Sequence, residues 1–167
     1  MISQKEATSR AKFFYKAIFG MNLIYPVKIL KDSEIEEIMR IRAEDSQIFS
    51  KRLTSVHGYF WHVEDEGVGD PEEAEIIINR KRCNDVNKFN STLIHELTHC
   101  ALWWQGYEYD DGEYDFEKKL TELGLPSNYS HDYSKKSANP DKKEPTKEVM
   151  EKYENMYREH LRRQLMG

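Results

Sequence analysis

Apolar residues recur at spacings of three and four in five stretches of the chain, a pattern typical of helices with one buried face. Ser3 is placed to cap the first of them, and Asn90 or Ser91 to cap the third. Glycines that can end a helix follow the first, third and fourth stretches. The pattern therefore predicts helices over residues 3–19, 32–41, 92–105, 116–123 and 147–166.

Three further segments are rich in residues that favour an extended chain. Residues 53–63 and 74–79 read as strands, and the acidic segment 64–73 between them contains glycines and a proline that favour turns, so we expect a hairpin with a long loop. Residues 23–30 read as a third extended segment, and Pro26 suggests that it lies at a sheet edge. The order of these elements predicts an α+β fold.

The domain organisation follows from a polar segment near the C-terminus. Residues 134–146 contain two prolines and almost no apolar side chains, which is typical of a linker. We therefore expect one domain over residues 1–133, a linker over 134–146 and a C-terminal amphipathic helix over 147–167. The helix either packs back on the domain or binds a partner, including its own twin.

Composition narrows the class of protein. Charged residues make up 33% of the 167 residues and hydrophobic residues 38%, and no apolar run approaches the roughly 18 residues that a membrane span requires. Residues 1–15 mix charged with apolar side chains, so no signal-peptide pattern is present. With only Cys83 and Cys100, a disulfide framework or zinc ribbon is not expected. These features predict a soluble, cytoplasmic protein that does not bind a membrane.

The acidic residues are unevenly placed. The net charge is −5, which gives no overall attraction to nucleic acid. Residues 60–75 contain seven acids and residues 108–117 contain six, and neither window contains Lys or Arg. The second window directly follows the third predicted helix, which also carries the candidate chemistry.

That helix contains His95, Glu96 and His99 in the HExxH arrangement. His99 lies only about 40° around the helix from His95, so both imidazoles can reach one metal ion from one face. Glu96 lies about 60° further round, where its carboxylate can take a proton from a metal-bound water. A metal site is the favoured interpretation, and a pair of solvated surface histidines is the alternative.

The apolar residues of the same helix fall on its opposite side. Relative to His95, a buried stripe is expected within about 60° of the opposite pole, formed by Leu93, Leu97, Cys100, Ala101 and Trp104. Trp103 lies nearer the histidines, where it either packs in the core or lines a cleft. The helix thus has one face for the core and one for a metal site.

A zinc hydrolase normally has three protein ligands and an open position for water, so a third ligand must come from elsewhere. Candidates in the acidic window after the helix are Asp110, Asp111, Glu113 and Asp115, and His131 follows further along the chain. A solvated acidic loop is the alternative explanation of that window.

Three segments of the chain together resemble the SprT-like zinc metalloproteases. They are the strand 74–79 that ends in Asn, the segment 91–99 with HExxH, and Gly112 to Phe116 before a helix. The resemblance spans about residues 55–125 and implies a zincin-like domain. In that family a Gly-His pair before a Phe supplies the third zinc ligand, and this chain has Gly112-Glu113 instead. The resemblance therefore favours Glu113, with Asp111, His131 or a site of only two protein ligands as alternatives.

The activity implied by the resemblance is zinc-dependent hydrolysis of a protein or peptide substrate. His95, His99 and the third ligand would hold Zn²⁺, and Glu96 would act as the general base. A second donor to the substrate could be one of four tyrosines that the sequence does not rank: Tyr107, Tyr109, Tyr114 and Tyr129. Because the site departs from the family pattern at Glu113, the alternative is a non-catalytic binding or adaptor protein that retains the metal. Association with DNA, known for other members, is only weakly favoured by this acidic chain, and the oligomeric state cannot be read from it.

Overall fold

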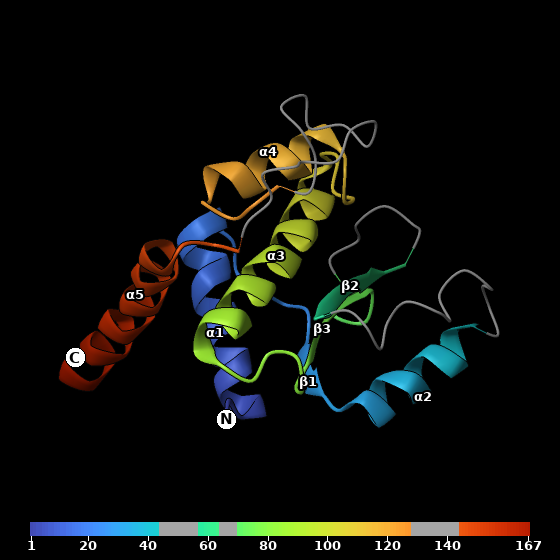
Figure 1. Ribbon diagram of the computed structural model, residues 1–167, viewed down its shortest axis with the longest axis horizontal. Coiled ribbons are helices and arrows are strands. Elements are labelled where there is room, and N and C mark those ends of the chain that lie inside the picture. Colours follow the sequence, from blue (N-terminus) through green and yellow to red (C-terminus); the bar gives the residue numbers. More distant parts are fainter. Residues whose placement is uncertain (44–56, 64–69, 128–143) are drawn as a thin grey trace.

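The computed structural model describes residues 1–43, 57–63, 70–127 and 144–167. Within these ranges the chain forms five helices and one three-stranded sheet, which confirms the α+β expectation (Figure 1). The helices are α1 (Gln4–Phe19), α2 (Asp32–Ala43), α3 (Val86–Gln105), α4 (Tyr114–Glu122) and α5 (Lys147–Met166). The strands are β1 (Val27–Leu30), β2 (Gly58–His62) and β3 (Ala74–Asn79). None of the described helices has both the length and the apolar character that crossing a lipid bilayer requires.

The sheet has the order β1-β3-β2, with β1 parallel and β2 antiparallel to β3. The pairing of β2 with β3 confirms the predicted hairpin strands, although residues 53–56 and the loop residues 64–69 lie outside the described part. β1 lies at the edge, as Pro26 suggested. There the side-chain amide of Gln4 takes the place of a neighbouring strand: it donates a hydrogen bond to the Val27 carbonyl (2.6 Å) and accepts one from the Ile29 N–H (3.0 Å).

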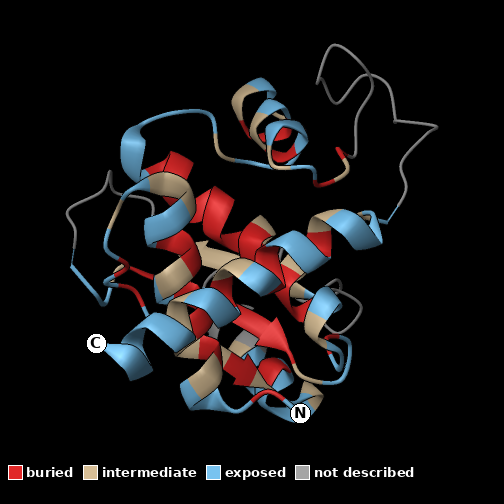
Figure 2. Cartoon of the chain, turned by 90° about the vertical axis from the view of Figure 1, so that its left-hand side faces the viewer, coloured by how far each residue is buried: buried red, intermediate tan, exposed pale blue. Residues whose placement is uncertain are grey.

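The two faces of the sheet pack against different helices. Ile76 and Ile78 of β3 belong to the main core shared with α1, α3 and α5, whereas Ile77 packs with Ile35 of α2 on the other face. Figure 2 shows the buried residues gathered where helices and sheet face one another, with the outward turns of the helices exposed. α3 therefore lies in the centre of the fold, with one side against the sheet and α1.

The start of α3 differs from the prediction. The helix begins at Val86, not at residue 92, and its cap is Asp85, whose carboxylate accepts a hydrogen bond from the Lys88 N–H (2.8 Å). Asn90 lies inside the helix and is fully buried. Its side-chain oxygen, the atom that would cap a helix, accepts a hydrogen bond from Arg10 of α1 (3.1 Å), and its amide nitrogen donates one to Glu154 of α5 (3.3 Å).

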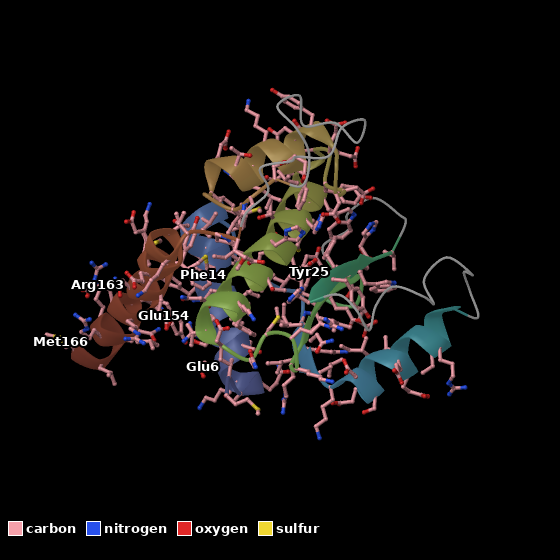
Figure 3. All side chains as sticks on the ribbon, viewed as in Figure 1. Glu6, Phe14, Tyr25, Glu154, Arg163 and Met166 are labelled. Carbon is pink, nitrogen blue, oxygen red and sulfur yellow. The ribbon has the colours of Figure 1, made fainter. Side chains whose placement is uncertain are left out.

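The C-terminal helix occupies the predicted residues 147–166 and packs against α1 and α3. Its residues Met150, Tyr153 and Tyr157 are buried in the main core. Between them, the Glu154 carboxylate contacts the buried guanidinium of Arg10 on α1. Figure 3 shows Glu154 where α5 meets α1, while Met166 lies at the outer end of α5. Most of the expected linker, residues 134–143, lies outside the described part.

Candidate metal centre

α3 presents the HExxH residues with the rotation that the sequence predicted. Leu93, Leu97, Cys100 and Ala101 are fully buried on one side of the helix. On the other side, the ring centroids of His95 and His99 lie 5.0 Å apart. One donor atom from each of His95, Glu96 and His99 lies within 4.8 Å of the other two. The three side chains are thus close enough to share one ion.

Asp111, from the turn after α3, brings a carboxylate to both histidines. Its Oδ1 lies 3.3 Å from His95 Nε2, and its Oδ2 lies 3.5 Å from His99 Nε2. A direct charge-assisted hydrogen bond would be shorter, about 2.7–2.9 Å. Ligands at about 2.0–2.2 Å from a tetrahedral zinc ion are separated from one another by roughly 3.3–3.6 Å. The spacing of these donors therefore fits a shared metal ion better than an ion pair.

Two contacts fix the orientation of the His99 ring. Its Nδ1 donates a hydrogen bond to the carbonyl oxygen of Tyr109, which leaves Nε2 on the side of Asp111. Phe116 of α4 stacks on the same ring, with centroids 3.9 Å apart and planes inclined by 7°. A carbonyl partner on the far nitrogen is the usual support of a metal-binding imidazole.

The turn from α3 to α4 places Asp111 and directs Glu113 elsewhere. α3 ends at Gly106, whose φ of 81° lies in the left-handed region that favours glycine. The Glu113 carboxylate accepts a hydrogen bond from the Asp110 N–H (3.0 Å), at the start of α4. Among the described contacts, Asp111 and not Glu113 reaches the histidine pair. The predicted alternative His131 lies outside the described part.

Burial and neighbouring charges shift the pKa values at the site in opposite directions. Glu96 is only 5% exposed, and burial raises the pKa of its carboxyl above the usual range. Burial alone would lower the pKa of His99, but the Asp111 carboxylate and the charge of Glu96 raise it to about 9. Desolvation opposes ionisation of Asp111, although its side chain is 56% exposed, and the two facing imidazoles lower the pKa of its carboxyl. The metal-free site therefore holds a proton on His99 and a charged Asp111.

Of the two tryptophans, Trp104 departs from the prediction, and Trp103 packs in the core, the first of the two alternatives given for it. Trp104, predicted on the core side, is 42% exposed, whereas Trp103 is 7% exposed. The Trp103 ring contacts Phe60 and His62 of β2, at centroid distances of 5.6 Å and 5.2 Å. Both residues lie in the last turn of α3, where β2 covers the side that carries Trp103.

Sequence reasoning missed His62 as a neighbour of the site. Its ring also contacts the ring of Tyr109, the residue whose carbonyl holds His99, at 5.1 Å. The alternation of side chains along β2 could have indicated it. Phe60 and His62 pair with Ile76 and Ala74 of β3, so their side chains lie on the face of the sheet that packs against α3.

The four tyrosines considered as second donors are spread around the turn. Tyr107 and Tyr114 are exposed, and Tyr109 contributes its carbonyl to His99. Tyr129 lies outside the described part. Cys100, next to His99 in sequence, is buried with its Sγ 3.7 Å from the hydroxyl of Tyr15, so it does not join the histidines.

In comparisons with models of protein families, with curated proteins and with solved structures, no match to this chain is found. The chemical features that bear on function lie in the site: two histidines one helical turn apart, a buried glutamate beside them, and the Asp111 carboxylate 3.3 Å and 3.5 Å from the two imidazoles.

Proposed function

We propose that the protein is a zinc-dependent peptidase of the SprT-like type, built on a zincin-like domain. His95, His99 and Asp111 would hold Zn²⁺, and Glu96 would be the general base. The observation that carries the proposal is the Asp111 carboxylate at 3.3 Å and 3.5 Å from the two Nε2 atoms, with buried Glu96 grouped with the same two histidines. Two imidazoles and one carboxylate are a donor set that zinc hydrolases use, with a fourth position left for water.

When bound, zinc would acidify a water molecule and polarise the scissile carbonyl. Glu96 is suited to receive the proton of that water, because burial raises the pKa of its carboxyl toward the range of an effective general base. It can then return the proton to the amine that leaves. His99 keeps its Nε2 available because Tyr109 holds the other ring nitrogen.

The test compares the unmodified chain with Glu96→Gln, both purified without chelator. Elemental analysis should find about one zinc ion per chain in each, since the proposed ligands His95, His99 and Asp111 are unchanged in the variant. Hydrolysis of a quenched peptide library should fall by about 10²–10⁴-fold in Glu96→Gln, the usual contribution of a general base. Glu148→Gln on the exposed face of α5 is the control and should keep full activity. Absence of zinc, or unchanged hydrolysis by Glu96→Gln, would contradict the proposal.

The same experiment separates the non-catalytic alternative. A chain that binds one zinc ion but cleaves no peptide, with Glu96→Gln indistinguishable from it, would support a binding or adaptor protein in which the metal is structural.

A further inference from the structure

The backbone at Tyr109 controls the position of two of the three proposed ligands. The Tyr109 carbonyl accepts the hydrogen bond from His99 Nδ1, and Asp111, whose carboxylate faces both histidines, follows two residues later. A shift of this backbone would therefore move the support of one ligand and the carboxylate of another at the same time. The geometry of the metal centre depends on what holds Tyr109 in place.

The hydrogen bonds on either side of Tyr109 are formed by exposed groups. The Glu108 N–H donates to the Asp115 carboxylate (3.1 Å), and the Asp110 N–H donates to the Glu113 carboxylate (3.0 Å). Exposed bonds of this kind add little net stability, because water offers the same groups other partners. They shape the turn between α3 and α4, but neither of them ties Tyr109 to the sheet.

The side chain of Tyr109 makes that connection. It is partly buried against the main core, and its ring meets the ring of His62 from β2. The two rings lie edge to face, with centroids 5.1 Å apart and planes inclined by 84°, which is a favoured geometry for aromatic pairs. β2 packs against α3 (Figure 1). The ring contact therefore joins the turn that follows α3 to the strand that lies beside α3.

His62 is itself held on several sides. Its Nδ1 donates a hydrogen bond to the Val63 carbonyl (2.6 Å). Its ring lies against Phe60 and Trp103, at centroid distances of 5.4 Å and 5.2 Å. The pairing of the strands continues past it, because the Val63 N–H donates to the Glu73 carbonyl (2.9 Å). A ring fixed by both its own strand and α3 is a firm support for a neighbouring side chain.

We propose that His62 is a positioning residue of the metal centre and acts through the ring of Tyr109. It keeps the Tyr109 carbonyl on His99 Nδ1 and thereby keeps Asp111 beside the histidine pair. This inference rests on the zinc site of the proposed function. His62 is not a ligand in this role, and among the described residues it does not belong to the group of donors that could share one ion.

The first test measures zinc affinity by chelator competition, in variants that circular dichroism shows to be folded. His62→Ala should weaken zinc binding about tenfold, the lower end of the range for residues that support a metal ligand. His62→Phe should remain within about threefold of the unmodified chain, because it keeps a ring against Tyr109. Tyr59→Ala is the matched control, since Tyr59 lies on the opposite face of β2, and it should leave the affinity unchanged.

A double-variant cycle tests whether His62 acts through Tyr109. Tyr109→Ala should by itself weaken zinc binding about tenfold or more. Adding His62→Ala should then change the affinity by less than about twofold, because the ring on which His62 acts is already gone. Full additivity of the two losses would overturn the inference. The same holds if His62→Phe binds zinc as weakly as His62→Ala, because the imidazole would then act on the metal directly.

An NMR measurement on the zinc-free protein separates failure of this inference from failure of the zinc site. The Nδ1–H of His99 is hydrogen-bonded to the Tyr109 carbonyl, so its proton should exchange slowly with water. In His62→Ala this exchange should be about tenfold faster, and in Tyr59→Ala it should be unchanged. If the unmodified chain binds no zinc, the proposed function fails, and faster exchange in His62→Ala would still support the positioning role. Exchange that His62→Ala leaves unchanged would overturn the inference, whether or not zinc binds.

Discussion

Glu154 holds α5 against the rest of the protein through a buried charge. Its carboxylate contacts Arg10 of α1 and accepts a hydrogen bond from Asn90 of α3. The Arg10 side chain is only 5% exposed, and its other ionic partner is Glu6, at 2.9 Å. Replacing Glu154 with leucine would therefore leave a buried guanidinium with half of its ionic partners.

These contacts set the expected loss in the free energy of unfolding. Removing one partner of a buried ion pair costs about 3–5 kcal/mol, and the lower end applies because Glu6 remains. We expect Glu154→Leu to lower the free energy of unfolding by about 3 kcal/mol, which for a chain of this size corresponds to a fall in Tm of roughly 6–12 °C. In Arg10→Met/Glu154→Leu no buried charge is left, so at least half of the loss should be recovered.

Urea unfolding followed by circular dichroism measures these differences directly. Glu151→Leu, on an exposed position of the same helix, is the control and should change the free energy of unfolding by no more than about 0.5 kcal/mol. A loss below about 1 kcal/mol in Glu154→Leu, or a double variant less stable than the single one, would refute the reasoning from the buried charge.

Four further predictions follow from the site and the core. Asp111→Asn should weaken zinc binding at least about 10–100-fold in a chelator competition, whereas Glu113→Gln should leave it nearly unchanged; the reverse result would restore Glu113 as the ligand. Because the pKa of His99 is raised to about 9 in the metal-free protein, zinc binding near pH 7 should release about one proton, and calorimetry should give a heat that depends on the buffer. Gly58→Ala should destabilise the protein by about 1–3 kcal/mol in urea, since its Cβ would lie 2.8 Å from a carbonyl oxygen of β3 and 2.9 Å from a methyl group of α3; a neutral effect would contradict this close approach. Burial works against ionisation of Glu154, yet Arg10 lowers the pKa of its carboxyl below the ordinary value of 4.5. The charged carboxylate therefore stabilises the fold above pH 4.5, and this contribution is lost as the pH falls through the lowered pKa. In Glu154→Leu the free energy of unfolding should accordingly depend less on pH in the acid range.

The periodic parts of the fold could be predicted closely. The bounds of α5 and β3 agree with the sequence pattern, and α1 agrees to within one residue. In these elements the residues that repeat with the helical or strand period are also the residues that the core buries, so local pattern and tertiary packing agree. The rotation of α3, with its histidines turned away from Leu93 and Leu97, was predictable for the same reason.

Local signals failed where a distant segment supplies the partner. Asn90 has the chemistry of a helix cap, but its side-chain oxygen accepts a hydrogen bond from Arg10, 80 residues away, and Asp85 caps the helix instead. Trp104 was predicted on the core side and is 42% exposed, whereas β2 covers Trp103, a neighbour that no pattern within α3 could indicate. The angular position of a residue around a helix predicts which residues share a side. It does not predict how far along the helix other elements cover that side.

By itself the sequence determined the type and order of the elements, the histidine face of α3 and the identity of Glu96 as the carboxylate beside it, because all of these depend on spacing within one helix or strand. Which carboxylate of the turn lies beside the histidine pair was decided only by tertiary structure. Asp111 and Glu113 are two residues apart and chemically alike, so composition and spacing could not separate them. The hydrogen bond that turns Glu113 toward Asp110, and the stacking of Phe116 on His99, bring Asp111 and not Glu113 to the histidine pair.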